Sequence, residues 1–525
     1  MSFKVLITDP VSEEGIKLLT DLKEIEVELK LELSPADLKK AVKDADAHII
    51  RSGTQVTAAV VEAAEKLKVI CRAGVGVDNI DIDAATQKGI VVMNVPGVNS
   101  NAAAELTMAL MLSLSRNVAY ADKSLKDGKW ERSSLVGQEL KNKKLGLIGF
   151  GKVGKEVALR ARAFEMEVQI HDPYVSDEII SASGAEAFEL NDLLKNVDYL
   201  SLHMPLNDDT RNIINAKSIA LMKDGVMLIN CARGGLVDEN ALSKALKSGK
   251  IRGAGLDVFE NEPPEGSPLL KADNVILTPH LGASTKEAKV GVSMGACRQV
   301  AEFLLHNKAE NALNVPFTGE ISPMLEPFID LAWKIGVLQS QLTGGEISKM
   351  KITCNGDIKE VTPIATSVLM GFISSSSTDP INNVNANYIA KQRGIKVTES
   401  YVHDGKNYRN LIESKISGPG GKFTVSGTVF AGEHKRIVQV NEYHMEVKPE
   451  GIMLFIKSKD KPGVIGKIGT LLGNENQNIA EFNLGRSEKS GVALSLVNLD
   501  SPLREDLLKL LADQEDIIEV EQVKF

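Results

Sequence analysis

The stretch KLGLIGFGKVGKEVALRARAF, residues 144–164, decides the fold of this chain. A short apolar run leads into Gly149, Gly151 and Gly154, spaced as G-x-G-x-x-G, and an amphipathic helical pattern follows. In such a turn the first glycine makes the tight bend, the second lets the backbone approach a pyrophosphate, and the third allows close packing of helix on strand. A plain β–α turn is the alternative for the six residues alone. The strand before them and the helix after them favour a dinucleotide site.

The next strand pattern ends at Asp172, 21 residues beyond Gly151. A carboxylate at this place accepts hydrogen bonds from the 2′-hydroxyl of a ribose and repels a 2′-phosphate. The phosphates themselves would meet the N–H groups and the positive end of the helix. The sequence therefore predicts NAD rather than NADP as the cofactor.

Bulk properties limit the class of protein. A chain of 525 residues is too long for one core, so three or four domains are expected. The net charge of −9 argues against a general nucleic-acid surface, and no apolar run reaches membrane-spanning length. Four scattered cysteines give no disulfide or metal framework, and the N-terminal MSFKVLITDP carries no secretory signal. We expect a cytoplasmic protein that binds no metal, nucleic acid or membrane.

The first 310 residues alternate β-branched runs with helical patterns, which is typical of parallel α/β sheets. A long helix over 98–116 suits a connection between two lobes. Strands are predicted at 4–8, 47–51, 68–72, 144–150, 167–172, 199–203, 226–230 and 274–278.

The pattern changes after residue 323. A helix around 325–342 and alternating strands such as 422–430 and 436–440 indicate a separate α+β domain. The last stretch has the order βαββαβ, which is ferredoxin-like. The predicted fold class is therefore two Rossmann-like doubly wound lobes followed by two smaller α+β domains.

Three short loops, each following a predicted strand, carry polar groups that a protein core does not select. They are MLINCARGGLVDE with Arg233, GLDVFENEPP with Glu262, and NVILTPHLGAST with His280. Strand ends in an open α/β sheet face the crevice where ligands bind. Each residue also has a simpler explanation: a surface arginine in a turn, a solvated glutamate and a core histidine.

Together, these three side chains suit hydride transfer between a hydroxy acid and a ketone. Removing hydride from a carbinol carbon requires removing the hydroxyl proton, which imidazole can take near neutral pH. A neighbouring carboxylate stabilises the imidazolium, and a guanidinium orients the substrate and polarises its carbonyl in the reverse direction. If the fold brings the loops together, Arg233, Glu262 and His280 are predicted to be catalytic.

The segments GFGKVG, NCARGGLVDE, LDVFENEPP and ILTPHLGAST together resemble the D-isomer-specific 2-hydroxyacid dehydrogenases. The resemblance covers roughly the first 310 residues in matching order, and it implies the same three catalytic residues. It also implies a discontinuous substrate-binding domain, 1–97 with 285–312, around an NAD-binding domain, 98–284.

Cofactor contacts follow from the same resemblance. The three glycines of the turn are the first of these contacts. At Met204 we expect a contact through the backbone only, because relatives can have threonine there. The remaining implied contacts are Lys152, Val153, Asp172, Cys231, Ala232, Arg233, Asp257, His280, Gly282 and Ala283.

Two further loops carry arginine: Arg51 in IIRSGT and Arg72 in ICRAGVGVDN. Singly, each could be an ordinary strand-end charge. The family resemblance places a substrate carboxylate on the N–H groups of Val75 and Gly76. Arginines on either side would then form a pocket for a second anionic group, and phosphate fits the guanidinium fork. Arg132 is a third candidate, because its segment resembles one that can approach a neighbour's site in dimers.

With RSGT, RAGVGVDN, DGKWER and the two C-terminal domains, the chain closely resembles the branch of this family that oxidises 3-phosphoglycerate to 3-phosphohydroxypyruvate with NAD, at the entry to L-serine synthesis. The resemblance implies a long form with an intervening domain, 317–450, a regulatory ACT domain, 452–525, and a homo-oligomer, dimer or tetramer. Two alternatives stay open. One is a dehydrogenase of another D-2-hydroxy acid, such as hydroxypyruvate or lactate. The other is a non-enzymatic NAD-sensing scaffold.

The segment KSKDKPGVIGKIGTLL lacks the spacing of a phosphate loop and resembles the start of an ACT domain. The resemblance implies allosteric binding of an amino acid, L-serine, at an interface of two subunits. A purely dimerising domain is the alternative. The effector contacts implied are Asp460, Pro462, Gly463, Val464 and Asn478.

Overall fold

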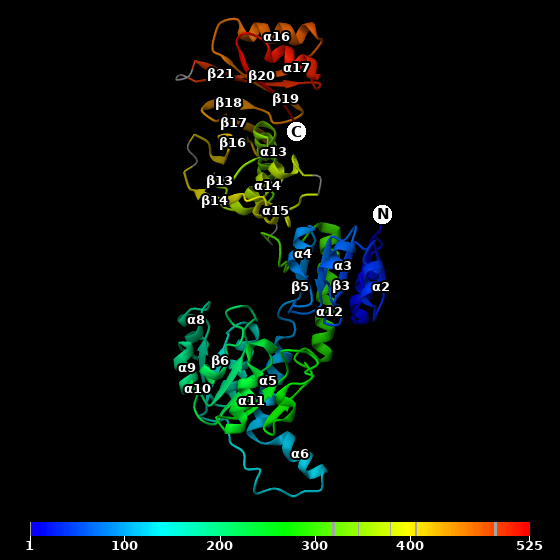
Figure 1. The fold of residues 1–525 in the computed structure, drawn as a ribbon, viewed down its shortest axis with the longest axis vertical. Helices are drawn as coiled ribbons and strands as arrows, with labels where there is room; N and C mark the ends of the chain where they lie inside the picture. Colours follow the sequence, from blue (N-terminus) through cyan, green and yellow to red (C-terminus); the bar gives the residue numbers. More distant parts are fainter. Residues whose placement is uncertain (1, 318–320, 345, 378–379, 405–406, 488–490) are drawn as a thin grey trace.

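The computed structural model describes residues 2–317, 321–344, 346–377, 380–404, 407–487 and 491–525. Four units follow one another along the long axis of the molecule (Figure 1). The dinucleotide lobe lies at one end and the C-terminal unit at the other, with the N-terminal lobe and the intervening unit between them. Among the helices of these residues, none is both long and apolar enough to cross a membrane.

The N-terminal lobe is a five-stranded parallel sheet with strand order β2-β1-β3-β4-β5. The apolar runs of its strands are buried between helices on both faces, as parallel sheets require. Its elements are β1 (Phe3–Ile7), α1 (Glu13–Thr20), β2 (Ile25–Leu29), α2 (Pro35–Ala41), β3 (Ala47–Ile50), α3 (Ala58–Ala63), β4 (Val69–Arg72), α4 (Ile82–Gln87) and β5 (Val91–Asn94).

One helix of this lobe comes from a distant part of the sequence. Helix α12 (Lys286–His306) packs against α1, β3 and β4, and its Val292, Ala296 and Val300 belong to the lobe's core. The chain therefore leaves the N-terminal lobe after β5 and returns to it through α12. The residue boundaries proposed for the four units stay predictions.

The dinucleotide lobe is a seven-stranded parallel sheet with order β12-β11-β10-β9-β6-β7-β8. The chain order reverses between β6 and β9, where a doubly wound sheet opens its ligand crevice. Its elements are α5 (Ser100–Ser115), α6 (Val118–Lys126), β6 (Lys144–Ile148), α7 (Lys152–Ala163), β7 (Glu167–His171), α8 (Asp177–Ala182), β8 (Glu186–Ala187), α9 (Leu190–Asn196), β9 (Tyr199–Leu202), α10 (Ala216–Leu221), β10 (Val226–Asn230), α11 (Glu239–Ser248), β11 (Ile251–Leu256) and β12 (Val275–Leu277).

The intervening unit is a six-stranded sheet of order β14-β13-β15-β16-β17-β18, parallel only between β13 and β14. Two helices, α13 and α14, pack on this sheet and against each other. They approach so closely at Gly336 and Gly371 that a Cβ at either glycine would lie 2.0 Å from a carbonyl oxygen of the other helix. Its elements are α13 (Glu326–Thr343), β13 (Lys349–Gly356), α14 (Val361–Ser374), α15 (Ala386–Gln392), β14 (Lys396–Val402), β15 (Asn410–Gly418), β16 (Gly421–Phe430), β17 (His434–Val440) and β18 (Tyr443–Val447).

The C-terminal unit confirms the predicted βαββαβ order. Its antiparallel sheet has the order β20-β21-β19-β22, and α16 and α17 cover one face. The elements are β19 (Ile452–Lys459), α16 (Val464–Asn474), β20 (Ile479–Arg486), β21 (Val492–Leu499), α17 (Glu505–Ala512) and β22 (Ile517–Lys524). With the two parallel sheets, this confirms the predicted fold class.

The intervening and C-terminal units share one hydrophobic core, although the sequence predicted separate units. The sheet face away from α16 and α17 carries Met453, Phe455 and Leu496, and these residues belong to the core cluster of the intervening unit. The rings of Phe423 and Phe455 lie 6.5 Å apart, one from each sheet. A sheet with two apolar faces must cover both of them, and helices cover only one face here.

We predict that Phe455→Ala destabilises the intervening unit as well as its own. Removing a buried aromatic ring costs about 3–5 kcal/mol. In a Trp130→Phe background the other tryptophan, Trp333 on α13, reports unfolding of the intervening unit. The urea midpoint of its fluorescence transition should fall in Phe455→Ala.

The control is Leu228→Ala in the core of the dinucleotide lobe. It should leave the Trp333 midpoint in place. An unchanged midpoint in Phe455→Ala would mean that the two units unfold independently.

Candidate active site

The three polar loops predicted to carry the chemistry are neighbours in the structure. They follow β10, β11 and β12, which lie side by side and parallel, so their carboxyl ends share one edge. The first two loops also touch directly: a Cβ at Gly234 would lie 1.8 Å from the carbonyl oxygen of Phe259. Only glycine fits there.

His280 and Glu262 form a hydrogen-bonded pair. His280 Nδ1 lies 2.7 Å from Glu262 Oε2, and both side chains are partly exposed to solvent. The other carboxylate oxygen of Glu262 accepts the N–H of Phe259 at 3.2 Å, which fixes the carboxylate. With Nδ1 facing the carboxylate, Nε2 is the nitrogen left to exchange a proton with a substrate. The alternative of a core histidine is wrong.

Asp257 holds the loop that carries His280. Its fully buried carboxylate accepts the N–H groups of Leu281 and Gly282 at 2.7 and 2.8 Å and the hydroxyl of Thr278 at 2.6 Å. The backbone of His280 has a φ of +56°, an uncommon value for a residue with a side chain. The buried carboxylate compensates for it. Asp257, predicted as a cofactor contact, is therefore engaged with its own chain.

Arg233 reaches across to the N-terminal lobe. Its Nε lies 3.3 Å from Asp78 Oδ2, and its Nη2 would be 2.1 Å from a Cβ at Gly76. The guanidinium thus lies directly over the backbone of Gly76, in the loop where the carboxylate site was predicted. Its Nη1 donates to the carbonyl of Ala232 at 2.7 Å.

Arg51 and Arg233 both lie near Arg72, so Arg72 is the centre of a cluster of three guanidinium groups at the junction of the lobes. Burial first, and then the positive charges of Arg233 and Arg51, lower the pKa of Arg72 to about 10. Arg72 Nη1 donates to the carbonyl of Gly76. Among the described residues, the buried Nε atoms of Arg51 and Arg72 find no hydrogen-bond partner. An anionic ligand is a partner suited to guanidinium donors of this kind.

The glycine-rich turn has the geometry that pyrophosphate needs. Gly149 has a φ of +99° and packs against the backbone of His203, and a Cβ at Gly154 would lie 2.3 Å from the carbonyl oxygen of Gly149. Gly151 has no atom within 4 Å of its Cβ position. Gly151 caps α7 without a side-chain hydrogen bond, so the first N–H groups of α7 are available to an anion.

Asp172 is held at the end of β7 in the position expected for ribose recognition. Its two oxygens accept the N–H groups of Phe150 at 2.7 Å and Tyr174 at 2.9 Å. Each carboxylate oxygen keeps a second lone pair for a ribose hydroxyl. The residues present therefore fit NAD.

The other predicted cofactor residues follow strand ends or line the same turn. Lys152, the first residue of α7, donates from Nζ to the carbonyl of Pro96 at 3.3 Å, so it ties the turn to the crossing between the lobes. The remaining residues lie beside the turn or at the carboxyl ends of β9, β10 and β12: Val153, Met204, Cys231, Ala232, Gly282 and Ala283.

Comparisons with known proteins agree with this arrangement. Residues 108–282 match the family described as D-isomer specific 2-hydroxyacid dehydrogenase, NAD binding domain, and residues 324–441 match the D-3-phosphoglycerate dehydrogenase intervening domain. The chain is 43% identical over 521 residues to the D-3-phosphoglycerate dehydrogenase of Methanocaldococcus jannaschii, which covers 98% of this chain and 99% of that protein. The enzyme of the same name from Bacillus subtilis is 38% identical over 524 residues, or 99% of each chain.

The chain belongs to the D-3-phosphoglycerate dehydrogenase family. Part of the chain also matches a solved structure, the NAD+-bound 3-phosphoglycerate dehydrogenase of Entamoeba histolytica. The TM-score is 0.50 at 30% identity, over 60% of this chain and 99% of that one. The chain is thus an NAD-dependent oxidoreductase, as predicted.

Arg132 is not brought to the arginine cluster of its own chain. Arg132 is exposed on the segment after α6. Helix α6 and that segment lie at the end of the dinucleotide lobe away from the N-terminal lobe (Figure 1). Its predicted role in the site of a neighbouring subunit stays a prediction.

The predicted effector residues lie at two separate places in the C-terminal unit. Gly463, with a φ of +90°, caps α16, which begins at Val464 directly after the turn of Asp460 and Pro462. Asn478 lies just before β20, at the opposite end of the sheet, roughly 25 Å away along the strands. Asn478 and the turn at Asp460 therefore cannot contact the same ligand within one copy of the chain.

Both polar effector candidates already have partners. Arg486 at the end of β20 donates to the carboxylate of Asp460 at 2.7 and 2.8 Å, and this pairing raises the pKa of Arg486. The amide of Asn478 donates to Asp500 at 2.7 Å.

Sequence reasoning missed Asp78 and Arg486. Asp78 stands in the glycine-rich loop that the resemblance already marked, and a charge next to a predicted carboxylate site was the available signal. Arg486 gave no signal, because its pairing spans 26 residues. Among the described residues, no group of His, Cys, Asp and Glu is arranged to hold a metal.

We predict that His280→Ala lowers kcat for NADH formation by about 10²–10⁴-fold, the usual contribution of a general base. The KM for NAD should change little. Glu262→Gln should lower kcat less, since an amide still holds the ring but does not stabilise its charge. Steady-state kinetics followed by the absorbance of NADH give kcat for both variants and KM for NAD.

His306→Ala is the matched control, an exposed histidine at the end of α12. It should keep the normal rate. A His280→Ala protein with undiminished kcat would exclude His280 as the proton acceptor.

Proposed function

We propose that this protein oxidises 3-phosphoglycerate to 3-phosphohydroxypyruvate with NAD, the entry step of L-serine synthesis. The observation that carries the proposal is the cluster of Arg51, Arg72 and Arg233, with two buried Nε atoms left without partners in the described chain. A substrate with a carboxylate at one end and a phosphate at the other would satisfy it. The names of the relatives support the same substrate.

The proposed chemistry divides among the three loops. The substrate carboxylate binds the N–H groups of Val75 and Gly76, beneath the guanidinium of Arg233. Bound NAD supplies the hydride acceptor. His280 takes the hydroxyl proton on Nε2, while Glu262 stabilises the imidazolium through Nδ1. Arg233 holds the oxygen as it becomes a carbonyl.

A dehydrogenase of an unphosphorylated D-2-hydroxy acid is the second candidate. The folds that carry both activities are alike, so the distinction depends on the anion pocket. Lactate has no second anion to pair with Arg51 and Arg72. The non-enzymatic NAD-sensing scaffold is disfavoured, because the His280–Glu262 pair is intact.

We predict that Arg51→Ala raises KM for 3-phosphoglycerate by about 10-fold to 100-fold. This is the change in affinity expected when one hydrogen bond between charged groups is lost. The rate with D-glycerate, which lacks the phosphate, should change little. NADH formation across 3-phosphoglycerate, D-glycerate and D-lactate measures the preference.

Arg298→Ala, which removes an exposed arginine from α12, is the control and should keep the preference. Equal kcat/KM for 3-phosphoglycerate and D-lactate in the wild-type protein would contradict the proposed substrate.

A homo-oligomer is the second part of the proposal. Helix α6 and the segment after it project from the dinucleotide lobe (Figure 1). This arm exposes the apolar side chains of Tyr120, Leu125, Trp130 and Val136, with Trp130 82% exposed. Exposed apolar surface of this extent marks an interaction site.

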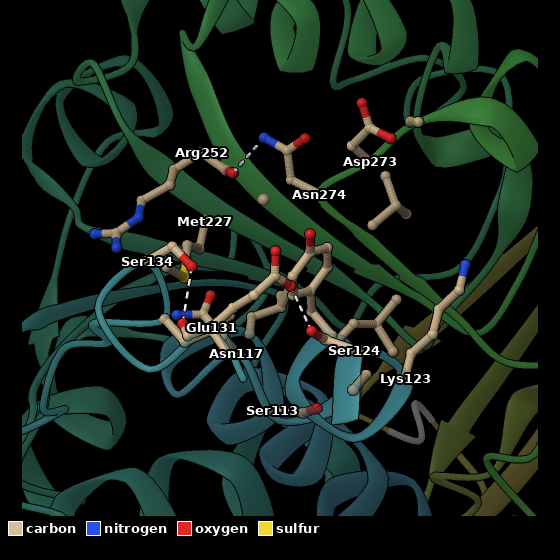
Figure 2. Close-up of a pocket in the computed structure, with 18 of the residues that line it drawn as sticks. Ser113, Asn117, Lys123, Ser124, Glu131, Ser134, Met227, Arg252, Asp273 and Asn274 are labelled. Atoms are coloured by element: carbon tan, nitrogen blue, oxygen red, sulfur yellow. Dashed lines mark hydrogen bonds between the residues drawn. The ribbon is translucent and has the colours of Figure 1, made fainter. Parts of the chain in front are cut away.

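Beside the arm lies a hollow of about 850 Å³. Glu131 and Ser134 of the arm line one side, and Arg252, Asp273 and Asn274 line the other (Figure 2). It opens at the amino ends of β11 and β12, so it is remote from His280. We infer that a second copy occupies it, because a two-fold axis would bury both arms at once.

Feedback regulation by L-serine is the third part. Because β20 is an edge strand, two C-terminal units could pair antiparallel through it. Asn478 of one copy would then approach the Asp460–Val464 turn of the other. The ammonium of serine would share Asp460 with Arg486, and the carboxylate would meet the N–H groups at the start of α16. An allosteric homotetramer would result if the arms pair as well.

We predict that millimolar L-serine lowers the activity and that Asp460→Ala removes this effect. Asp513→Ala, an exposed carboxylate of the same unit, should leave inhibition unchanged. Sedimentation of the same samples should give a multiple of the single-chain mass. Unchanged activity and no serine binding in calorimetry would exclude the regulatory proposal, and a monomer would exclude the oligomer.

A further inference from the structure

The loop that carries Arg51 is fastened to the end of β1. The N–H groups of Arg51 and Thr54 both donate to one carboxylate oxygen of Asp9, at 2.5 and 3.1 Å. Asp9 is 6% exposed, so its carboxylate is buried beneath the loop. The side chain of Arg51 returns to the same place, because its Nη1 donates to the carbonyl of Pro10 at 3.3 Å. The turn after β1 therefore holds Arg51 at both its backbone and its guanidinium.

The backbone carbonyl groups of the same loop are also hydrogen-bonded. The amide of Asn79 donates to the carbonyl oxygens of Arg51 and Thr54 at 2.7 and 2.6 Å. The hydroxyl of Thr54 lies 2.9 Å from that of Thr8, which in turn lies 2.8 Å from Nε2 of His48. These bonds fix the backbone polar groups of Arg51 and Thr54 through buried or half-buried partners.

Asp9 also contributes its charge. It lies close enough to Arg72 for its negative charge to raise the pKa of that arginine, against the lowering by burial and by Arg233. Gly53 shows how tightly the carboxylate fits, because a Cβ at Gly53 would lie 2.6 Å from Asp9 Oδ1. The sequence RSGT thus has glycine where the loop passes over Asp9.

We propose that Asp9 is a positioning residue for recognition of the substrate's phosphate, acting through Arg51. The carboxylate orders the loop of residues 51–54 before the substrate arrives, so that binding does not have to order it. This inference rests on the proposed function. It adds a specificity-determining residue that contacts neither substrate nor cofactor.

The principal test is Asp9→Ala. KM for 3-phosphoglycerate should rise about tenfold, comparable to the loss of one hydrogen bond between charged groups. The values of kcat and of KM for NAD, and the rate with D-glycerate, should stay within about twofold. Asp9→Asn keeps an oxygen for both N–H groups, so it should recover most of the affinity.

Gly53→Ala tests the same contact from the exposed side of the loop and leaves the buried carboxylate of Asp9 in the chain. It should reproduce the KM effect by displacing the carboxylate, whereas Ser52→Ala should not. Asp46→Ala is the matched control for Asp9, since Asp46 accepts the N–H of Lys4 at 3.0 Å at the opposite end of the same sheet. It should leave KM for 3-phosphoglycerate unchanged.

A double-mutant cycle shows whether Asp9 acts through Arg51. In an Arg51→Ala background, Asp9→Ala should change KM no further than about twofold. Additive effects would overturn the inference, and so would an unchanged KM in both Asp9→Ala and Gly53→Ala. Parallel losses with NAD and with D-glycerate would also overturn it. A wild-type protein inactive on 3-phosphoglycerate would instead refute the proposed function.

Discussion

The buried carboxylate of Asp257 organises the candidate active site of this protein. It accepts two backbone N–H groups and a hydroxyl from the loop after β12, and this fixes a residue, His280, whose backbone would otherwise favour another conformation. The imidazole is thereby turned toward Glu262 on the neighbouring loop. The arrangement is possible because parallel strands end at one edge, so loops separated by many residues become neighbours. A charge placed away from water is stable here because several donors surround it.

The parts of the fold that the sequence predicted are those encoded locally. The three glycines around Gly151, the strand ahead of them and the helix after them form one short segment, and the structure has the expected turn. The loops of Arg233, Glu262 and His280 could be located because each follows an apolar strand pattern. The resemblance of four segments then related them to one family, and the strand order brought them together.

The parts that the sequence did not predict depend on contacts between distant residues. Asp78 meets Arg233 only when the two lobes face each other, and Asp460 meets Arg486 only in the finished sheet. The separation of Asn478 from the turn at Asp460 follows from strand direction, which periodicity does not encode. The common core of the last two units was missed for a related reason. A strand that is buried on both faces has the same apolar sequence pattern whether a helix or another unit covers its second face.

That common core has a consequence for how the chain can be shortened. A protein ending before β19 would leave Phe423, Tyr443 and Met445 facing water, and an isolated C-terminal unit would expose Met453, Phe455 and Leu496. Each fragment would expose a contiguous apolar surface and tend to aggregate. Loss of the C-terminal unit would therefore require new polar residues on the sheet left behind. The two units are therefore expected to fold stably only as a pair, whereas the N-terminal and dinucleotide lobes have cores of their own.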